Sequence, residues 1–85
     1  MRNVELRPAV RKALRKLCRK DPAQYSSVMQ KIQEIASSTA HYKRLRYSFK
    51  ELQRVHVRSY VLIFYLEDDW VVFVEYEHHD DVYKR

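Results

Sequence analysis

The spacing of apolar residues changes once along this chain of 85 residues, close to His41. Before that point apolar residues recur every three or four positions, which is the period of an amphipathic helix. Beyond it they alternate with polar residues or run continuously, as they do in strands. Helices that precede a group of strands are typical of an α+β domain. We therefore expect a single domain over residues 1–85, with an N-terminal helical hairpin packed on one face of a small, mainly antiparallel four-stranded sheet.

Two helices are predicted before the change of period. Pro8 suits the first position of a helix, where its missing N–H has no partner to lose. The apolar stripe of this helix is formed by Val10, Leu14, Leu17 and Cys18. Asp21 and Pro22 then end the first helix and begin a second one, with Asp21 as the N-cap. Because free cysteines are mostly buried, we expect Cys18 to lie in the core.

Four strands are predicted. Their ranges are 3–6, 52–58, 60–66 and 70–76. The third range is apolar on both faces, which places it inside the sheet, and the first range should add at an edge. The chain contains no glycine, so Asp68 and Asp69, which tolerate positive φ, are expected to form the hairpin turn. The absence of glycine also excludes P-loop and dinucleotide-binding motifs.

The charge is unevenly distributed along the chain. Residues 1–58 contain 15 lysines and arginines against 4 acidic residues, a net charge of +11, whereas residues 59–85 contain 2 against 7, a net charge of −5. A surface with such an excess of cations attracts polyanions at long range, and nucleic acid is the commonest of these. A solvated surface without a partner explains the charge alone equally well. The placement of the cations therefore matters more than their number.

A cationic stripe lies on the second predicted strand. Because side chains alternate across a strand, Arg54, His56 and Arg58 should share one face. Arginine presents forked donors that suit phosphate oxygens, so this stripe is a candidate phosphate-binding site. Three further cations precede it and extend the candidate RNA-binding surface, namely Lys43, Arg44 and Arg46. The alternative is the ordinary solvated face of a half-buried strand.

The end of the chain carries groups that can transfer protons. These groups are His78, His79 and Tyr83. An imidazole can act as an acid or as a base near neutral pH. A metal site is a weaker interpretation, since adjacent residues of an extended segment point to opposite sides and too few ligands converge. We therefore expect no metal and no other cofactor.

The compartment is predicted from what the sequence lacks. The single cysteine excludes an internal disulfide and a zinc site built from several cysteines. No stretch has the length and apolar character of a membrane span, and the first five residues lack the apolar core of a signal peptide. We expect a cytoplasmic protein with no membrane partner.

The predicted order of a strand, two helices and an antiparallel meander resembles the RelE/ParE superfamily of toxin–antitoxin toxins. Two sequence motifs carry the resemblance, LQRVHVRSYVLIF at 52–64 and HHDDVY at 78–83. The resemblance covers nearly the whole chain in organisation and is most specific in these two motifs. The sequence departs from the family pattern at Val61, where many members have an arginine.

The resemblance implies a RelE-like toxin of a type II toxin–antitoxin system, a ribosome-dependent mRNA interferase that inhibits translation. In such a metal-independent endoribonuclease, the 2′-hydroxyl of the RNA attacks the adjacent phosphate. Carried over by position, the residues that bind this phosphate are Arg54, His56 and Arg58. The general acid or base is His78, His79 or Tyr83. The implied partners are a cognate antitoxin, the ribosome with its mRNA, and operator DNA bound by the toxin–antitoxin complex.

The shared fold leaves two alternatives open. A ParE-like inhibitor of DNA gyrase has the same architecture and no need of the histidines or of Tyr83 at the end of the chain. A catalytically inactive module with the RelE fold, retained for binding, is the other alternative.

Overall fold

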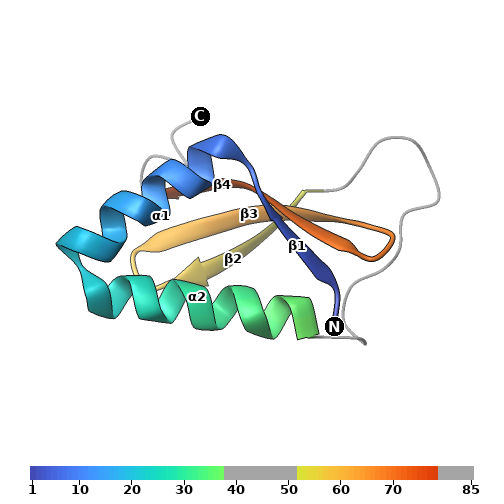
Figure 1. The fold of residues 1–85 in the computed structure, drawn as a ribbon, viewed down its shortest axis with the longest axis horizontal. Helices are drawn as coiled ribbons and strands as arrows, with labels where there is room; N and C mark the ends of the chain where they lie inside the picture. The colour runs from blue at the N-terminus through green and yellow to red at the C-terminus, as the bar shows by residue number, and fades with distance from the viewer. Residues whose placement is uncertain (38–51, 79–85) are drawn as a thin grey trace.

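The computed structural model describes residues 1–37 and 52–78 of the chain. The elements follow one another as β1 (Asn3–Leu6), α1 (Pro8–Lys20), α2 (Pro22–Ser37), β2 (Gln53–Val57), β3 (Tyr60–Glu67) and β4 (Trp70–His78). The strands form one four-stranded sheet in the order β1-β4-β3-β2, and both helices lie on one side of it (Figure 1). The predicted α+β class, helical hairpin and four strands are confirmed.

Asp21 joins the two helices. Its backbone N–H donates to the Leu17 carbonyl of α1 over 2.8 Å, and its carboxylate Oδ1 accepts from the Gln24 N–H over 3.1 Å. The first bond closes the last turn of α1, and the second caps α2, which begins at Pro22. The predicted boundary between the helices is confirmed. Neither helix of the described ranges has the length and apolar content that a membrane-spanning segment requires.

Three pairings hold the sheet together. β2 pairs with β3 and β3 with β4 in antiparallel fashion, whereas β1 pairs with β4 in parallel. The parallel pairing joins residues 3–6 with residues 70–73. The Arg7 N–H extends it by donating to the Phe73 carbonyl over 3.0 Å. As predicted, β3 lies inside the sheet and β1 at an edge.

Both hairpin turns place a residue other than glycine at positive φ. Asp68, between β3 and β4, has a φ of 52°, and Arg58, between β2 and β3, has a φ of 60°. Aspartate is enriched in this backbone region, and the predicted turn at Asp68 and Asp69 is confirmed. The strand predicted over 52–58 is one residue too long at each end. Its pairing stops at Val57, and Arg58 belongs to the turn.

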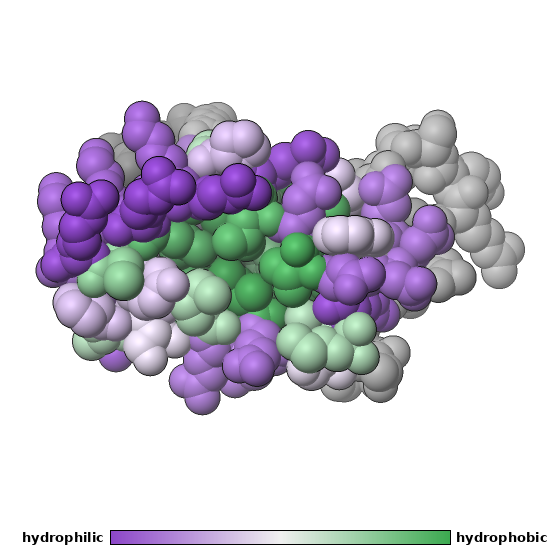
Figure 2. Space-filling view, in the orientation of Figure 1, coloured by the Kyte–Doolittle hydropathy of each residue, from purple (hydrophilic) through white to green (hydrophobic). Residues whose placement is uncertain are grey.

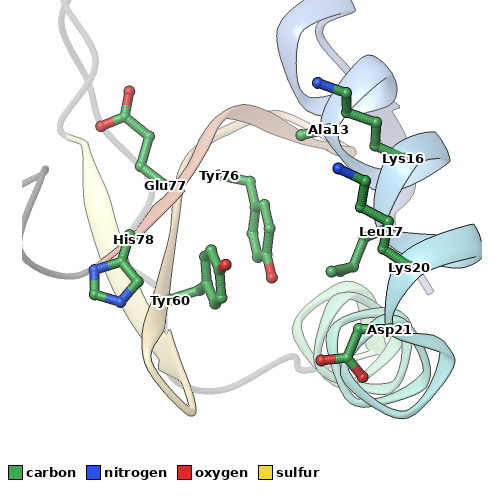
Figure 3. Close-up of a pocket in the computed structure, with 9 residues that line it drawn as sticks. All are labelled: Ala13, Lys16, Leu17, Lys20, Asp21, Tyr60, Tyr76, Glu77 and His78. Atoms are coloured by element: carbon green, nitrogen blue, oxygen red, sulfur yellow. The ribbon is translucent and has the colours of Figure 1, made fainter.

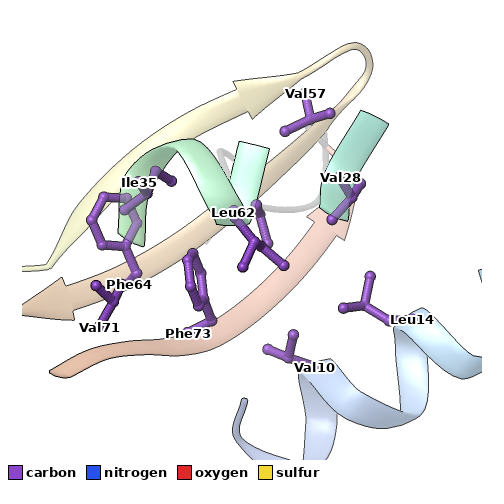
Figure 4. Packing of buried hydrophobic residues seen from close by; sticks show 10 residues of the cluster. Val10, Leu14, Val28, Ile35, Val57, Leu62, Phe64, Val71 and Phe73 are labelled. Carbon is purple, nitrogen blue, oxygen red and sulfur yellow. The ribbon is translucent and has the colours of Figure 1, made fainter. Parts of the chain in front are cut away.

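The main core lies between the helices and the sheet (Figure 4). Its buried members are Val10, Leu14, Val28, Ile32, Ile35, Val57, Leu62, Phe64, Val71 and Phe73. The rings of Phe64 and Phe73 pack with their centroids 5.5 Å apart. Burial of each such side chain contributes about 1.5–3 kcal/mol. This layer holds the helical hairpin on one face of the sheet.

Cys18 is exposed, and the prediction that it lies in the core was wrong. Positions four apart on a helix differ by about 40° in direction, since 3.6 residues make one turn. Val10 and Leu14 face the core, and Cys18, one further step along, has rotated away from it. The thiol of Cys18 therefore lies on the solvent-exposed side of α1.

Gln24 is a polar side chain buried between α2 and the sheet, with 3% of its surface exposed. Its amide Nε2 donates to the Val57 carbonyl over 3.0 Å and to the Tyr76 hydroxyl over 3.1 Å. The two acceptors lie at the end of β2 and on β4, strands that β3 separates. One amide thus ties α2 to two strands of the sheet. Burial raises the pKa of Tyr76, an effect that the hydrogen bond from Gln24 partly offsets.

Replacing Gln24 with methionine should lower the free energy of unfolding by about 1–3 kcal/mol, because the Val57 carbonyl stays buried and loses its donor. Urea denaturation followed by far-UV circular dichroism measures the change. Gln33→Met is the matched control, since Gln33 is exposed on the same helix. The control should change the free energy by less than about 0.5 kcal/mol. Equal losses in the two variants would show that the buried amide has no special role.

Tyr76 should keep its proton in the folded protein at alkaline pH values where the unfolded chain has lost it, because free tyrosine ionises at about pH 10. The unfolded state then binds fewer protons than the folded state, so the free energy of unfolding should fall as the pH rises above about 10. Urea denaturation at a series of alkaline pH values measures this decline. Tyr76→Phe should make the decline shallower, and an unchanged slope in that variant would contradict the raised pKa.

Candidate nucleic-acid interface

The sequence points to nine candidate site residues, of which the described part of the chain contains Arg54, His56, Arg58 and His78. The other five lie outside the described residues, namely Lys43, Arg44, Arg46, His79 and Tyr83. The four described residues do not form one cluster. β2 carries two of them, the turn after β2 carries the third, and β4 ends at the fourth.

Arg54 and His56 are neighbours on one face of β2. Both are exposed, whereas Val55 between them is half-buried and Val57 is buried in the core. Strand alternation produces this pattern, because the valines point toward the helices and the side chains of Arg54 and His56 point away from them. Positions two apart on a strand are separated by about 7 Å. Both side chains can therefore reach one phosphodiester group.

The antiparallel register continues this face across the sheet. Arg54 and His56 pair with two residues of β3, which in turn pair with Glu75 and Glu77 of β4. The two residues of β3 are Val61 and Ile63, which form a second buried cluster with Val74. Strands are spaced about 4.8 Å apart, so roughly 10 Å separates the cationic edge of this face from its acidic part. We call the surface around Arg54 and His56 the cationic face.

Two arginines on this side of the sheet have different surroundings. Arg7 donates to the Tyr65 hydroxyl over 3.1 Å and lies 3.2 Å from a carboxylate oxygen of Glu5. The hydrogen bond with Tyr65, followed by the charge of Glu5, raises the pKa of Arg7. The side chain of Arg54, in contrast, makes no hydrogen bond or ion pair with the described residues 1–37 and 52–78. Arg54 is exposed on β2.

Arg58 does not continue the stripe of β2. It was predicted to share a strand face with Arg54 and His56, and the structure corrects this because β2 ends at Val57. The left-handed backbone of Arg58, at a φ of 60°, interrupts the alternation of side chains. The residue is exposed at the corner of the hairpin.

A β-bulge decides on which side of the sheet the end of β4 presents its side chains. The pairing of β3 with β4 skips Val74, which is therefore an extra residue on β4. Phe73, just before it, points into the core. Beyond the extra residue the alternation of side chains is reversed. Glu77 consequently lies on the side of the cationic face, and His78 lies on the side of the helices.

His78 is thus separated by the sheet from Arg54 and His56. It pairs with Tyr60, and the two rings meet edge to face with centroids 5.3 Å apart. Tyr60 in turn stacks on Tyr76, with centroids 4.9 Å apart and ring planes 9° from parallel. Because the Tyr76 hydroxyl contacts α2, these rings lie on the helical side. The structure does not bring His78 to the cationic face.

The two stacked tyrosines and His78 line a hollow of about 690 Å³ between α1 and the end of the sheet (Figure 3). Lys16 and Lys20 form its wall on α1. Both tyrosines are partly buried. The sequence did not predict the hollow, because no motif marks where α1 passes the end of β4. The spacing of four between the lysines, which places them on one helix face, was the available signal.

No protein-family model matches the chain. Two curated proteins resemble it along nearly its whole length. A protein of Methanocaldococcus jannaschii described as "Putative toxin RelE4" is 35% identical over 88 residues, which cover 100% of this chain and 94% of that protein. An uncharacterized protein of Methanosarcina mazei is 29% identical over 83 residues, which cover 94% of this chain and 96% of that protein.

Two solved structures have a similar fold. A copper-bound mutant toxin from Helicobacter pylori matches with a TM-score of 0.61 at 16% identity, over 96% of this chain and 99% of that chain. A chain of the DinJ–YafQ complex of E. coli matches with a TM-score of 0.59 at 24% identity, over 98% of this chain and 99% of that chain. At these identities the likeness concerns the fold alone.

Three observations agree on the family. The structure has the strand, helical hairpin and meander that the sequence motifs implied. Both solved chains share this arrangement over nearly their whole lengths. The 35% sequence identity with the protein of Methanocaldococcus jannaschii is measured over the full chain. This chain therefore belongs to the RelE family of toxins.

Proposed function

We propose that this RelE-family toxin is a ribosome-dependent mRNA interferase, a metal-independent endoribonuclease that stops translation in the cytoplasm. The observation that carries the proposal is the pair Arg54 and His56, exposed two positions apart on the cationic face. The guanidinium of Arg54 has the forked geometry that binds two phosphate oxygens together. The net charge of +11 on residues 1–58 draws RNA toward the protein.

The proposed reaction is an internal transfer of the phosphodiester. The 2′-oxygen of the RNA gives its proton to a general base and attacks the adjacent phosphorus, which forms a P–O2′ bond. The P–O5′ bond breaks, and the departing 5′-oxygen takes a proton from a general acid. The products are a 2′,3′-cyclic phosphate and a 5′-hydroxyl. Negative charge accumulates on the phosphorane oxygens in the transition state, where Arg54 and His56 stabilise it.

The proton transfers are assigned to His79 and Tyr83, which lie outside the described residues, with His56 as a further candidate on the cationic face. Such transfers contribute typically about 10²- to 10⁴-fold to a rate. His78 is left out of this role, because its ring packs edge to face against Tyr60 on the helical side of the sheet. Arg58, at the corner of the hairpin, is assigned to RNA binding, together with the three cations before β2.

The shape of the cationic face supports a role for the ribosome. Arg54 and His56 stand on an exposed strand, and Val61 is buried beside them at the position where many family members have an arginine. The described residues of this face supply charge but few contacts that would align the 2′-oxygen with the breaking P–O5′ bond. Alignment of reacting groups is worth as much as about 7–11 kcal/mol. A codon held in the ribosomal A site receives this alignment from the ribosome.

A cognate antitoxin is the proposed protein partner. One of the similar solved chains belongs to the DinJ–YafQ complex. Exposed apolar side chains also favour a protein partner. Trp70 is 44% exposed and Leu52 is 47% exposed. We further propose that the toxin–antitoxin complex binds the operator DNA of its own genes.

Primer extension on mRNA bound to programmed ribosomes tests the nuclease. The wild-type protein should cut within the A-site codon. Arg54→Ala and His56→Ala should each slow cleavage by about 100-fold or more, because each removes a group placed beside the developing charge. Both variants should remain folded by circular dichroism, since both side chains are exposed.

Two matched variants serve as controls for this experiment. Arg7→Ala removes a guanidinium that Glu5 and Tyr65 already hold, and His78→Ala removes an imidazole from the helical side of the sheet. Both controls should retain most of the wild-type cleavage rate. If Arg54→Ala and His56→Ala cleaved as fast as these controls, the cationic face would not be the active site.

An absence of cleavage by the wild-type protein on active ribosomes would overturn the nuclease altogether. A supercoiling assay with DNA gyrase then separates the two alternatives. Inhibition of gyrase identifies a ParE-like toxin, and no inhibition identifies an inactive binding module.

A further inference from the structure

The hollow between α1 and the end of the sheet differs in chemistry from one end to the other. Its volume of about 690 Å³ lies within the range of about 300–1,000 Å³ that is typical of small-molecule sites. It extends along α1 from Ala13 to Asp21, a rise of about 12 Å. Lysines lie toward one end, tyrosine rings form a wall, and a carboxylate lies at the other end (Figure 3). The proposed cleavage reaction uses none of these side chains.

Lys16 and Lys20 form the cationic end of the hollow. They lie one turn apart on the same face of α1, and both are exposed. Their side chains run back toward the start of the helix, as long side chains on helices do, so the ammonium groups lie away from Asp21 (Figure 3). A phosphate monoester carries nearly two negative charges at neutral pH. The two ammonium groups therefore match the charge of one terminal phosphate.

The aromatic wall can hold a planar ring. Tyr60 covers one face of Tyr76, with centroids 4.9 Å apart and ring planes 9° from parallel, and His78 packs edge to face against Tyr60. Figure 3 shows Tyr76 between Tyr60 and α1, so the second face of its ring is directed toward the helix. Ala13 and Leu17 line the hollow on the helix side. A nucleobase in this space would stack on a tyrosine and contact aliphatic side chains opposite, which favours nucleotide binding.

Asp21 forms the acidic end of the hollow. Its Oδ1 accepts the N–H of Gln24, and the carboxylate can accept further hydrogen bonds, since its two oxygens have about four acceptor sites. Glu77 also lines the hollow, but its side chain points away from Tyr76 and α1 (Figure 3). A ligand that fits both ends must therefore have an anionic group at one end and hydrogen-bond donors at the other.

Guanine is the RNA base whose edge fits a carboxylate best. Its N1–H and N2–H lie beside each other, so both can donate to one carboxylate group. Uracil instead presents carbonyl oxygens on both sides of its N3–H, and Asp21 would repel them. An acidic peptide would pair with the lysines but would also be repelled by Asp21. Inorganic phosphate would contact the lysines alone and leave the tyrosine wall unused.

We propose that the hollow binds a guanosine 5′-monophosphate unit. Its phosphate pairs with Lys16 and Lys20. Its base stacks on Tyr76 and donates from N1 and N2 to the carboxylate of Asp21. The unit is either the free nucleotide or the 5′-phosphorylated end of an RNA strand, because both carry the same terminal phosphate. The sheet separates this site from the cationic face, so nucleotide binding does not depend on the proposed nuclease.

Isothermal titration calorimetry of the whole protein with GMP tests the site. GMP should bind at least about tenfold more tightly than guanosine, which lacks the phosphate, and than UMP, whose base edge is repelled by Asp21. Inorganic phosphate should also bind at least about tenfold more weakly than GMP, because it cannot stack. An absence of GMP binding would overturn the inference. Equal affinities for GMP and any of the other three probes would overturn it as well.

Neutral substitutions on α1 test the phosphate contacts. Lys16→Gln combined with Lys20→Gln should weaken GMP about tenfold or more and leave guanosine unchanged. Arg15→Gln combined with Arg19→Gln is the matched control, with the same spacing and charge change, since neither arginine lines the hollow. Both arginines instead border the apolar surface between α1 and α2, beside which Figure 2 shows hydrophilic side chains gathered over α1. Equal weakening by the two double variants would indicate general attraction to a basic helix and refute the site.

Asp21→Asn tests the contact with the base. Asparagine is as good an N-cap as aspartate, so the junction of the helices should remain folded, which circular dichroism checks. The side chain loses its charge and part of its accepting capacity. GMP should bind about tenfold more weakly, and its advantage over UMP should disappear. A preference for GMP that survives in this variant would contradict the inference.

An RNA strand that begins with guanosine distinguishes the two sources of the nucleotide. If its 5′-phosphorylated form binds at least about tenfold more tightly than its 5′-hydroxyl form, and the lysine double variant removes the difference, the ligand is an RNA end. If GMP binds as expected but the two strands bind equally, the ligand is the free nucleotide.

Arg54→Ala keeps this site apart from the cationic face. If this variant weakened GMP as much as the lysine double variant does, the nucleotide would bind at the cationic face, and the inference would be wrong. We expect the Kd of GMP to stay unchanged in Arg54→Ala. Cleavage of mRNA on the ribosome without GMP binding refutes the hollow alone, whereas GMP binding without cleavage refutes the nuclease alone.

Discussion

The buried amide of Gln24 is the contact on which the rest of the structure depends. It reaches from α2 to the end of β2 and to the hydroxyl of Tyr76 on β4. A side-chain amide with two acceptors in the interior fixes direction as well as distance, which apolar contacts do not. The end of β2 next to His56 and the stack of Tyr60 on Tyr76 are both held by this single group. It therefore connects the cationic face with the hollow on the helical side.

Strand alternation then assigns different chemistry to the two sides of the sheet. One side carries Arg54 and His56 on β2, and the bulge at Val74 adds Glu75 and Glu77 on β4 to the same side. This side thus has a positive edge and a negative part, with apolar residues of β3 between them. A phosphate is attracted to the first and repelled by the second. This field would direct the proposed RNA substrate along β2.

The elements of the fold were predictable from the sequence because their signals are local. A change in the spacing of apolar residues can be recognised from neighbouring residues alone. The same holds for a turn at an aspartate such as Asp68 in a chain without glycine. The errors concern positions whose surroundings are set from a distance. Cys18 keeps the spacing of a core residue but turns outward on α1, and Arg58 follows the alternation of β2 but lies beyond its last pair. The side occupied by His78 depends on the bulge at Val74, which no local pattern marks, so only Arg54 and His56 could be placed together from sequence.

The parallel pairing of β1 with β4 joins the two ends of the described chain, residues 3–6 and 70–73. During synthesis β1 has no partner until residues 70–73 have been made, and until then the apolar faces of α1 and α2 have no complete sheet to pack against. Contacts between segments so far apart in sequence form late in folding. The finished sheet, and with it the cationic face, therefore forms only after the ribosome has synthesised β4.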